Sequence, residues 1–307
     1  MAAEPSLDMR MEFRGLDPPP GVHIPTGAEL FSLCTAEHPR RFSMGIPYPA
    51  ESPVLWIKYG RPVLWNEVPA QTMAYHELRR LGSAVRVPAI YYACTVEYKT
   101  YIVMEYIPGK TAAKSLEGVS DPAKKEAIFR LIALGLSELH RIPVPPQSRP
   151  SAIDGDRIRH RLFDEQEAPR HYQSVDQLEE HLNLFLKITR RTQRVQKLSQ
   201  EPMVFCFSDL WLGNFMIDDG GRVIVIDFAD CSFLPSSFSK FALLPSQNNY
   251  PCDITGWVNV PSVDGIDNTE ALCAMAGPMI VGSSSFESCG LRVPGAGWAP
   301  ELDNPTN

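Results

Sequence analysis

The chain has 307 residues, a length that can hold a substantial hydrophobic core and two lobes or domains. Its formal net charge of −7 argues against a general nucleic-acid-binding protein, which normally carries a basic face. Its seven cysteines form no C-x-x-C pair and predict reduced thiols in a cytoplasmic protein, and its apolar run from Ala271 to Val281 is too short for a membrane span, so no membrane partner is expected.

The first part of the chain predicts an arm followed by a small lobe. Residues 1–25 are rich in proline and glycine, which favours a flexible N-terminal arm. Residues 26–107 are predicted to form the small lobe. Within it, Val54 to Lys58 has the pattern of a strand that ends in a lysine. Asn66 is a good N-cap residue and Pro69 is tolerated in a first helical turn, so a helix is expected to run to about Leu81.

A largely apolar strand, Thr100 to Met104, closes the small lobe. The segment Glu105 to Gly109 then breaks the strand with a proline and a glycine. A short extended connector of this kind leaves backbone N–H and C=O groups without strand partners. It is either a plain linker or a site where main-chain atoms recognise a ligand, and the two interpretations are compatible.

The larger lobe is predicted to span residues 108–245. Ser120-Asp121-Pro122 predicts the start of its first helix. A second helix is predicted from Val175 to about Leu198, with Ser174 as its N-cap. Five basic residues fall on or beside that second helix, and a solvated face explains them better than a polyanion site. They are Lys187, Arg190, Arg191, Arg194 and Lys197. Residues 246–307 are rich in Gly, Ser, Pro and Asn, and predict either a partly disordered tail or an abbreviated lobe.

Residues 203–230, MVFCFSDLWLGNFMIDDGGRVIVIDFAD, carry the strongest functional signal. Asp209 is followed five residues later by Asn214, and Asp227 lies thirteen residues further along. An aspartate alone at a turn or strand end is commonly there to bond its own backbone. Together, the three residues match phosphoryl-transfer chemistry, in which one carboxylate meets an acceptor hydroxyl while an amide oxygen and a second carboxylate hold magnesium against ATP.

The local pattern predicts how these three residues are presented. Phe215 to Ile217 and Val223 to Ile226 have the pattern of two short buried strands. Asp218-Asp219-Gly220-Gly221 between them is a strong hairpin turn. A hairpin would deliver Asn214 and Asp227 to the same end of the two strands.

Several segments resemble the aminoglycoside phosphotransferase and choline kinase group of kinase-like enzymes, in particular a eukaryotic branch of that group. FSDLWLGNFMID is similar to the catalytic loop, commonly H-G-D-x-x-x-x-N, and IDFADCSFLPSSF to the magnesium loop. VLWIKYG resembles the lysine strand, and TYIVMEYIPGKT the strand and hinge between the lobes. The resemblance runs from about Val54 to about Leu244. It implies a two-lobed, protein-kinase-like α+β fold, with a five-stranded antiparallel sheet and one helix in the small lobe and a mainly helical larger lobe.

The resemblance implies an ATP-dependent transfer of the γ-phosphoryl group to a hydroxyl of a small molecule, with ATP and Mg²⁺ as the cofactors. Asp209 is then the catalytic residue that orients the hydroxyl and accepts its proton. Asn214 and Asp227 are then the magnesium ligands.

The remaining roles fall on the small lobe and hinge. Lys58 is expected to grip the α and β phosphates, although a lysine at a strand end is commonly just an exposed charge. Glu67 is the preferred carboxylate partner, although a glutamate also suits a helix N-terminus. Glu77 is the competing acid, and it lies ten positions along the same helix. The main chain of Glu105 and Ile107 is expected to bind the adenine ring.

The chain also departs from the group's pattern. Phe207 and Ser208 stand where the group usually has His and Gly, and no G-x-G-x-x-G precedes the lysine strand. Only Ser43-Met44-Gly45 suggests a phosphate-covering turn. A protein kinase is disfavoured because H-R-D, D-F-G and A-P-E are missing. The main alternative is a non-catalytic nucleotide-binding or interaction protein on the same fold.

Overall fold

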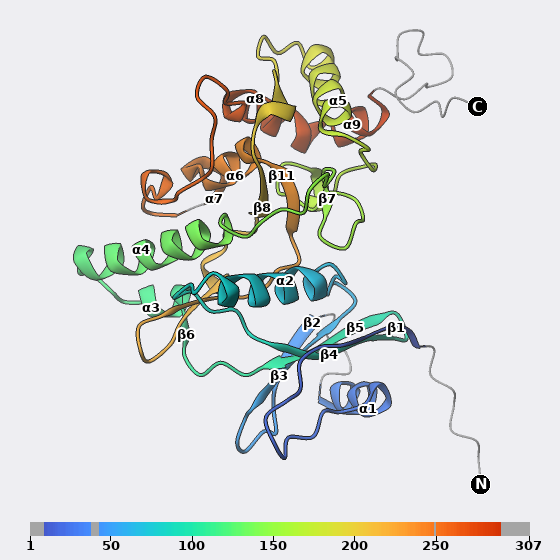
Figure 1. The fold of residues 1–307 in the computed structure, drawn as a ribbon, viewed down its shortest axis with the longest axis vertical. Helices are drawn as coiled ribbons and strands as arrows, with labels where there is room; N and C mark the ends of the chain where they lie inside the picture. The colour runs from blue at the N-terminus through green and yellow to red at the C-terminus, as the bar shows by residue number, and fades with distance from the viewer. Residues whose placement is uncertain (1–8, 38–42, 249, 290–307) are drawn as a thin grey trace. The chain divides into compact units, whose positions relative to one another are not determined.

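The computed structural model describes residues 9–37, 43–248 and 250–289. The chain divides into two compact units (Figure 1). The N-terminal unit comprises Met1–Ser115 and Phe215–Ala229, and the C-terminal unit comprises Leu116–Asn214 and Asp230–Asn307. The mixed α+β class and the kinase-like division into a sheet-based and a helical part agree with the sequence prediction.

The N-terminal unit is built on a five-stranded antiparallel sheet, as predicted. Its order is β1-β4-β5-β3-β2. The strands are β1 (Met9–Arg14), β2 (Ser43–Tyr48), β3 (Leu55–Gly60), β4 (Ile90–Val96) and β5 (Lys99–Glu105). The prediction of a flexible arm over residues 1–25 is wrong for β1, which pairs with β4 at the sheet edge. Residues 1–8 lie outside the described residues.

Two helices cover the opposite faces of this sheet, α1 (Gly27–Glu37) and α2 (Glu67–Arg80) (Figure 1). The prediction of a single helix is therefore wrong. Tyr101 and Val103 of β5 pack in the cluster that contains Leu30 of α1, while Ile102 packs in the cluster that contains Val68 of α2. Because successive strand residues point to opposite faces, a strand covered on both sides carries apolar residues in succession, as β5 does from Tyr101 to Met104.

A second sheet in the N-terminal unit contains the predicted hairpin. It has the order β10-β9-β6, from β6 (Lys110–Thr111), β9 (Phe215–Ile217) and β10 (Val223–Val225). The turn is closed by a bond from Gly221 N to Asp218 O of 2.9 Å, as expected for this sequence. The hairpin was assigned to the larger lobe, but it groups with the N-terminal unit. One reason is a bridge between Arg86 and Ile224, in which Val225 N donates to Arg86 O.

The C-terminal unit combines a short antiparallel sheet of order β7-β11-β8 with a helical layer. The strands are β7 (Ser151–Ala152), β8 (Met203–Phe207) and β11 (Cys231–Pro235). The α-helices are α4 (Pro122–Leu139), α5 (Val175–Ile188), α6 (Ser236–Leu243), α7 (Pro245–Asn248), α8 (Thr269–Val281) and α9 (Ser283–Ser288), and α3 (Ala112–Leu116) lies where the two units join along the chain. The 3₁₀ turns are η1 (Asp164–Gln166), η2 (Leu198–Gln200), η3 (Leu212–Asn214) and η4 (Thr255–Trp257).

The predicted helix starts of this unit are confirmed, and one predicted end is wrong. Asp121 and Ser174 accept hydrogen bonds from the first turns of α4 and α5, at 3.0 and 3.2 Å. Helix α5 ends at Ile188, ten residues before the predicted Leu198, because Arg190 adopts a left-handed backbone with φ +57°. Of the five basic residues, only Lys187 lies on the helix.

The tail predicted over residues 246–307 is ordered across much of its described part. Leu272 and Met275 of α8, together with Phe286 of α9, belong to a buried apolar cluster of the C-terminal unit. Residues 290–307 lie outside the described residues. Within the described part of the chain, no helix is both long and apolar enough to cross a membrane.

Candidate active site

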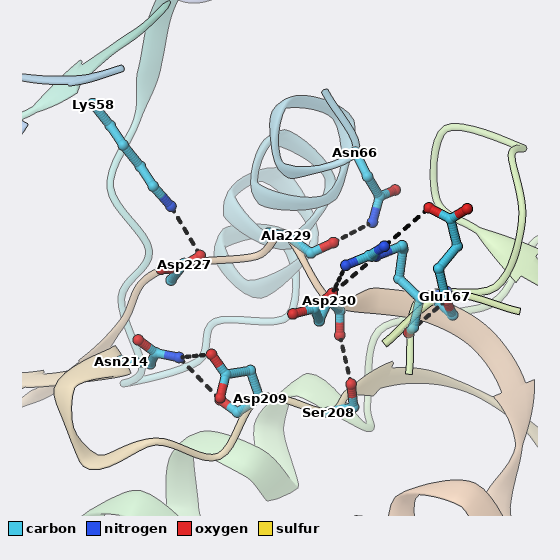
Figure 2. Close-up of polar contacts among 11 residues, drawn as sticks. Lys58, Asn66, Glu167, Ser208, Asp209, Asn214, Asp227, Ala229 and Asp230 are labelled. Carbon is cyan, nitrogen blue, oxygen red and sulfur yellow. Dashed lines mark hydrogen bonds and ion pairs between the residues drawn. The ribbon is translucent and has the colours of Figure 1, made fainter. Parts of the chain in front are cut away.

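Lys58 is held in the sheet of the N-terminal unit between two carboxylates. Strand β3 places it opposite Gly45 of β2 and Ile102 of β5. Its Nζ donates to Glu67 Oε2 at 2.6 Å and to Asp227 Oδ1 at 2.9 Å, and Figure 2 shows the second contact. The predicted pairing of Lys58 with Glu67 is therefore confirmed. Asp227, which follows the distant β9–β10 hairpin in the chain, accepts a second hydrogen bond from the Lys58 ammonium group.

The charge of Lys58 is secured by this arrangement. Burial alone lowers the pKa of an ammonium group, because the cation loses hydration. The charges of Glu67 and Asp227 outweigh that effect and raise the pKa of Lys58 above its ordinary value. The Lys58 side chain is 20% exposed and that of Glu67 only 1%. Lys58 is thus a fixed cation that can bind anionic oxygens.

Glu77, the competing acid, does not take part in this cluster. It accepts hydrogen bonds from Arg80 on the same helix, with the shortest contact at 2.7 Å. Ten residues of α-helix separate it from Glu67 by about 15 Å, so only one of the two glutamates can meet Lys58.

Asp227 adopts an unusual backbone conformation. Its φ is +64°, in the left-handed region that few residues other than glycine enter. Such a conformation persists only where surrounding contacts hold it, and it is common at functional sites. Two residues further on, Ala229 O accepts a hydrogen bond of 2.8 Å from Asn66 Nδ2 (Figure 2). The contacts with Lys58 and Asn66 hold this segment in place.

The predicted role of Asn66 was wrong. It occupies the N-cap position of α2, but its side chain makes no capping hydrogen bond and its backbone is already helical. Its amide instead holds Ala229, 163 residues away in the sequence. Short-range patterns favour Asn as a cap, and they contain no signal for a partner that distant.

A cavity of about 430 Å³ lies in the N-terminal unit beside Lys58. This volume is in the range of small-molecule sites. Its lining combines apolar side chains with Lys58 and its two carboxylate partners. The lining residues are Gly45, Trp56, Lys58, Glu67, Pro88, Met104, Glu105, Tyr106, Ile107, Gly109, Thr111, Lys114, Met216, Ile226 and Asp227.

The connector after β5 presents a backbone with open hydrogen-bonding groups to this cavity. Glu105 N donates to Ala89 O at 2.8 Å, and Tyr106 N donates to Val54 O at 3.1 Å. Ile107 is 7% exposed, yet neither its N–H nor its C=O bonds to any residue in the described ranges. A buried backbone group with no internal partner can pair with a ligand. Ile107 thus offers a donor and an acceptor, whereas the N–H of Glu105 is already used.

The phosphate-covering turn suggested at Ser43-Met44-Gly45 is not a turn. These residues form the start of strand β2. Gly45 lies against the indole ring of Trp56, where an added Cβ would come within 2.2 Å of a ring carbon. Residues 38–42, which precede the strand, lie outside the described residues.

Asp209 and Asn214 form a pair in the C-terminal unit. Asn214 Nδ2 donates to Asp209 Oδ2 at 2.8 Å and to Asp209 O at 3.0 Å (Figure 2). Asn214 is 1% exposed and ends the turn η3, immediately before β9. Both of these bonds are donated by its amide nitrogen. Its Oδ1 therefore has no hydrogen-bond partner within the described ranges and can accept a further ligand.

The chemistry of these donors fits magnesium. Mg²⁺ prefers oxygen ligands and commonly takes one or two from the protein, with the rest from phosphates and water. Among the described residues, no group of three or more His, Cys, Asp or Glu side chains could hold a metal alone. Asn214 Oδ1 is open, and Lys58 contacts only one oxygen of Asp227. Each of the two residues thus keeps a side-chain oxygen of the kind that Mg²⁺ prefers.

The model of the phosphotransferase enzyme family, abbreviated APH, matches residues 61–235, which is more than half of the chain. The chain belongs to this family. The matched range contains Glu67, Asp209, Asn214 and Asp227, and begins three residues after Lys58. Among curated proteins, no sequence matches the chain significantly.

Solved structures similar to this member of the phosphotransferase family include three antibiotic phosphotransferases. A thermostable mutant of aminoglycoside phosphotransferase APH(4)-Ia is 12% identical, covers 81% of this chain and 90% of its own, and gives a TM-score of 0.44. APH(3'')-Id from Streptomyces rimosus, solved with ADP and streptomycin, is 14% identical with coverages of 81% and 97% and a TM-score of 0.41. Spectinomycin phosphotransferase APH(9)-Ia, with ADP and spectinomycin, is 12% identical with coverages of 84% and 86% and a TM-score of 0.43.

In this phosphotransferase family member, the loop after β8 is supported without the histidine that the sequence pattern of the group leads one to expect. Phe207, in that position, is buried at the end of β8. The next residue, Ser208, donates from both its N and its Oγ to Asp230 O, each at 3.1 Å (Figure 2). The Asp230 carboxylate is itself bound by Arg159 at 2.9 Å. Sequence reasoning did not identify the pair of Arg159 and Asp230, because the two residues are 71 positions apart in the chain.

Proposed function

We propose that the protein is an ATP-dependent phosphotransferase that moves the γ-phosphoryl group to a hydroxyl of a small molecule. The observation that carries the proposal is the cluster of Lys58, Glu67 and Asp227 beside a cavity into which Ile107 presents an open backbone. Membership of the phosphotransferase family supports the same reaction class. The free cysteines suit a reducing compartment, and we propose a cytoplasmic location.

The N-terminal unit binds the nucleotide in this proposal. The backbone of Ile107, with the carbonyl of Glu105, recognises the adenine edge, and apolar residues such as Met104 and Ile226 enclose the ring. Lys58 meets phosphate oxygens because it is a fixed cation. Glu67 keeps Lys58 directed into the cavity, since a charged hydrogen bond of 2.6 Å restricts a flexible side chain.

Asp209 serves the acceptor in this proposal. The acceptor hydroxyl oxygen forms the new bond to the γ-phosphorus, the bond from that phosphorus to the β–γ bridging oxygen breaks, and the hydroxyl proton moves to the Asp209 carboxylate. Asn214 fixes the orientation of that carboxylate through its hydrogen bond to Oδ2, and its second bond, to the carbonyl oxygen of Asp209, holds the main chain. Asn214 and Asp227 would hold magnesium, which neutralises phosphate charge when it is bound.

A non-catalytic nucleotide-binding protein is the alternative, and the absent histidine is the feature that favours it. The bonds from Ser208 to Asp230 weaken this alternative, because they give the catalytic loop a different support. Asp209 also keeps the geometry that proton transfer needs, since one carboxylate oxygen is oriented by Asn214 and the side chain remains partly exposed. We therefore favour the enzyme.

The first experiment measures nucleotide binding. ATP should raise the melting temperature of the parent protein, and magnesium should increase that shift. Asp227→Ala should lose most of the magnesium-dependent part, whereas Asp219→Ala, an exposed residue of the same hairpin, should behave like the parent. An unchanged magnesium effect in a folded Asp227→Ala protein would contradict the metal assignment.

The second experiment measures chemistry. ATP turnover is assayed against a library of hydroxyl compounds, and the best acceptor is used in single-turnover transfer. Asp209→Asn should slow transfer by about 10²–10⁴, the usual contribution of positioned proton transfer, with ATP affinity within a few-fold of the parent. Equal rates in the two proteins would remove Asp209 from the mechanism and leave the nucleotide-binding alternative as the better account.

A further inference from the structure

Three arginines alternate along residues 157–161 of the C-terminal unit, and they differ in their partners. Arg157 is ion-paired with Glu167. Arg159 binds Glu167 at 3.0 Å and Asp230 at 2.9 Å. Within the described ranges, Arg161 has no hydrogen-bonded or ion-paired carboxylate, although its side chain is partly buried. The first two arginines have structural partners that the third does not have.

The backbone places this segment beside the catalytic loop. Arg159 N donates to Ser232 Oγ at 2.8 Å, and Ser232 Oγ donates back to Arg159 O at 3.0 Å. Ser232 lies on β11 and pairs with Cys206 of β8, three residues before Asp209. The chain next to Arg161 is also fixed, because His160 is fully buried and its ring bonds to Phe238 O. Arg161 thus starts from a rigid position near the exit of β8.

The electrostatics agree with this placement. Burial lowers the pKa of the Arg161 guanidinium, and the negative charge of Asp209 acts in the opposite direction. Burial likewise raises the pKa of the Tyr250 phenol, with Asp209 adding to the effect. The Tyr250 ring packs on Phe129 of α4, with ring centroids 5.6 Å apart. Asp209 therefore lies within the electrostatic field of a partly desolvated cation.

An aromatic side chain is exposed in the catalytic loop itself. Trp211 is 65% exposed, and its backbone N approaches Asp209 Oδ1 at 3.4 Å. Its ring lies over Gly213, where an added Cβ would come within 2.2 Å of the ring. Only glycine permits this close approach, so the loop presents a flat apolar surface two residues along the chain from Asp209. A solvent-exposed indole is suited to stacking on a planar ligand.

We propose that the acceptor is an anionic alcohol, in which an oxyanion is bound by Arg161 and a planar apolar part stacks on Trp211. The inference rests on the proposed function and names the substrate class of the same site. A guanidinium without a carboxylate in contact pairs well with a carboxylate or phosphate, often through two hydrogen bonds. The same guanidinium would repel a polycationic acceptor.

The test uses four aryl alcohols that share a hydroxymethyl group and differ in the para substituent: carboxylate, phosphate, hydroxymethyl or aminomethyl. Binding of each compound is measured by calorimetry with ADP and magnesium present. The parent should bind the carboxylate or the phosphate compound at least about tenfold more tightly than the aminomethyl compound. The anion that binds more tightly identifies which oxyanion the site prefers. Arg161→Gln should weaken anion binding by about 10- to 100-fold, the range for a lost charge-assisted hydrogen bond.

Two controls separate the possible outcomes. Arg157→Gln removes a neighbouring arginine that is paired with Glu167, and this variant should bind the four compounds with the affinities of the parent. Trp211→Leu should bind all four compounds more weakly. The proposal is overturned if the aminomethyl compound binds as tightly as the anions, if none of the four binds, or if Arg161→Gln lowers only ATP affinity. ATP with magnesium is titrated in parallel, so that a failure of the proposed function appears separately as a parent protein that does not bind nucleotide.

Discussion

Replacing Glu67 by glutamine should destabilise the protein and weaken nucleotide binding together. Removing one partner of a buried ion pair typically costs about 3–5 kcal/mol when the other charge is left uncompensated. Lys58 keeps Asp227 at 2.9 Å and is 20% exposed, so part of that cost is recovered. We expect the free energy of unfolding to fall by about 2 kcal/mol, within the range for a hydrogen bond to a charged group.

The measurement is urea unfolding of the parent and of Glu67→Gln. Glu77→Gln on the same helix is the matched control, because Glu77 pairs with Arg80 at the surface. A surface pair contributes about 0–1 kcal/mol. ATP titration with magnesium should show an affinity loss of roughly tenfold for Glu67→Gln only, since 1.4 kcal/mol corresponds to a factor of ten. If the two variants differ by less than about 0.5 kcal/mol and bind ATP equally, the pairing of Lys58 with Glu67 does not position the lysine.

Three further predictions concern other parts of the fold. Asn66→Ala leaves the carbonyl of Ala229 without its partner, so the free energy of unfolding should fall by about 1–3 kcal/mol and magnesium-dependent ATP binding should weaken. If the variant equals the parent in both measurements, the hydrogen bond from Asn66 to Ala229 does not hold this segment. Burial, with Arg170, lowers the pKa of His181 to about 3 from 6.5, so the unfolded state binds the proton preferentially. The free energy of unfolding of the parent should therefore fall with acidification from pH 6.5 towards pH 3, by up to about 1.4 kcal/mol per pH unit more than in His181→Gln, and parallel pH curves would exclude this contribution. Gly45→Ala should cost about 1–3 kcal/mol of stability in thermal unfolding, because the added methyl group overlaps the indole of Trp56, and an unchanged melting temperature would show that the ring moves freely.

Local patterns were sufficient for the parts of the site that depend on neighbouring residues. The hairpin around Asp218 and Gly221 and the start of α4 at Asp121 rest on residues a few positions apart. Turn and cap preferences act at that range, and they predict such features well. The pairing of Glu67 with Lys58, nine residues apart, was instead expected from the resemblance to kinase-like enzymes. The five-residue spacing of Asp209 and Asn214 is equally local, and the fold brings these two side chains into hydrogen-bond contact.

Contacts between distant segments could not be predicted in the same way. Asn66 satisfied every rule for a cap, yet the hydrogen bond that its amide makes depends on Ala229. Strand β1 was overlooked because the Pro and Gly content of the whole arm obscured the alternation of Met9, Met11 and Phe13. The left-handed backbone of Asp227 likewise leaves no mark in composition, because the surrounding fold imposes it.

The N-terminal unit is assembled from two separate stretches of chain, and this affects the order in which the protein can mature on the ribosome. Synthesis delivers Lys58 long before Asp227, which lies 169 residues further along. Until the hairpin has emerged, the cavity lacks Met216, Ile226 and Asp227, so a nascent chain has no complete nucleotide site. Domains generally fold as units during translation, but here the first unit must wait for most of the second to be made. ATP can therefore stabilise only a chain that extends at least to Asp227, and truncation before the hairpin should yield a chain that nucleotide cannot rescue.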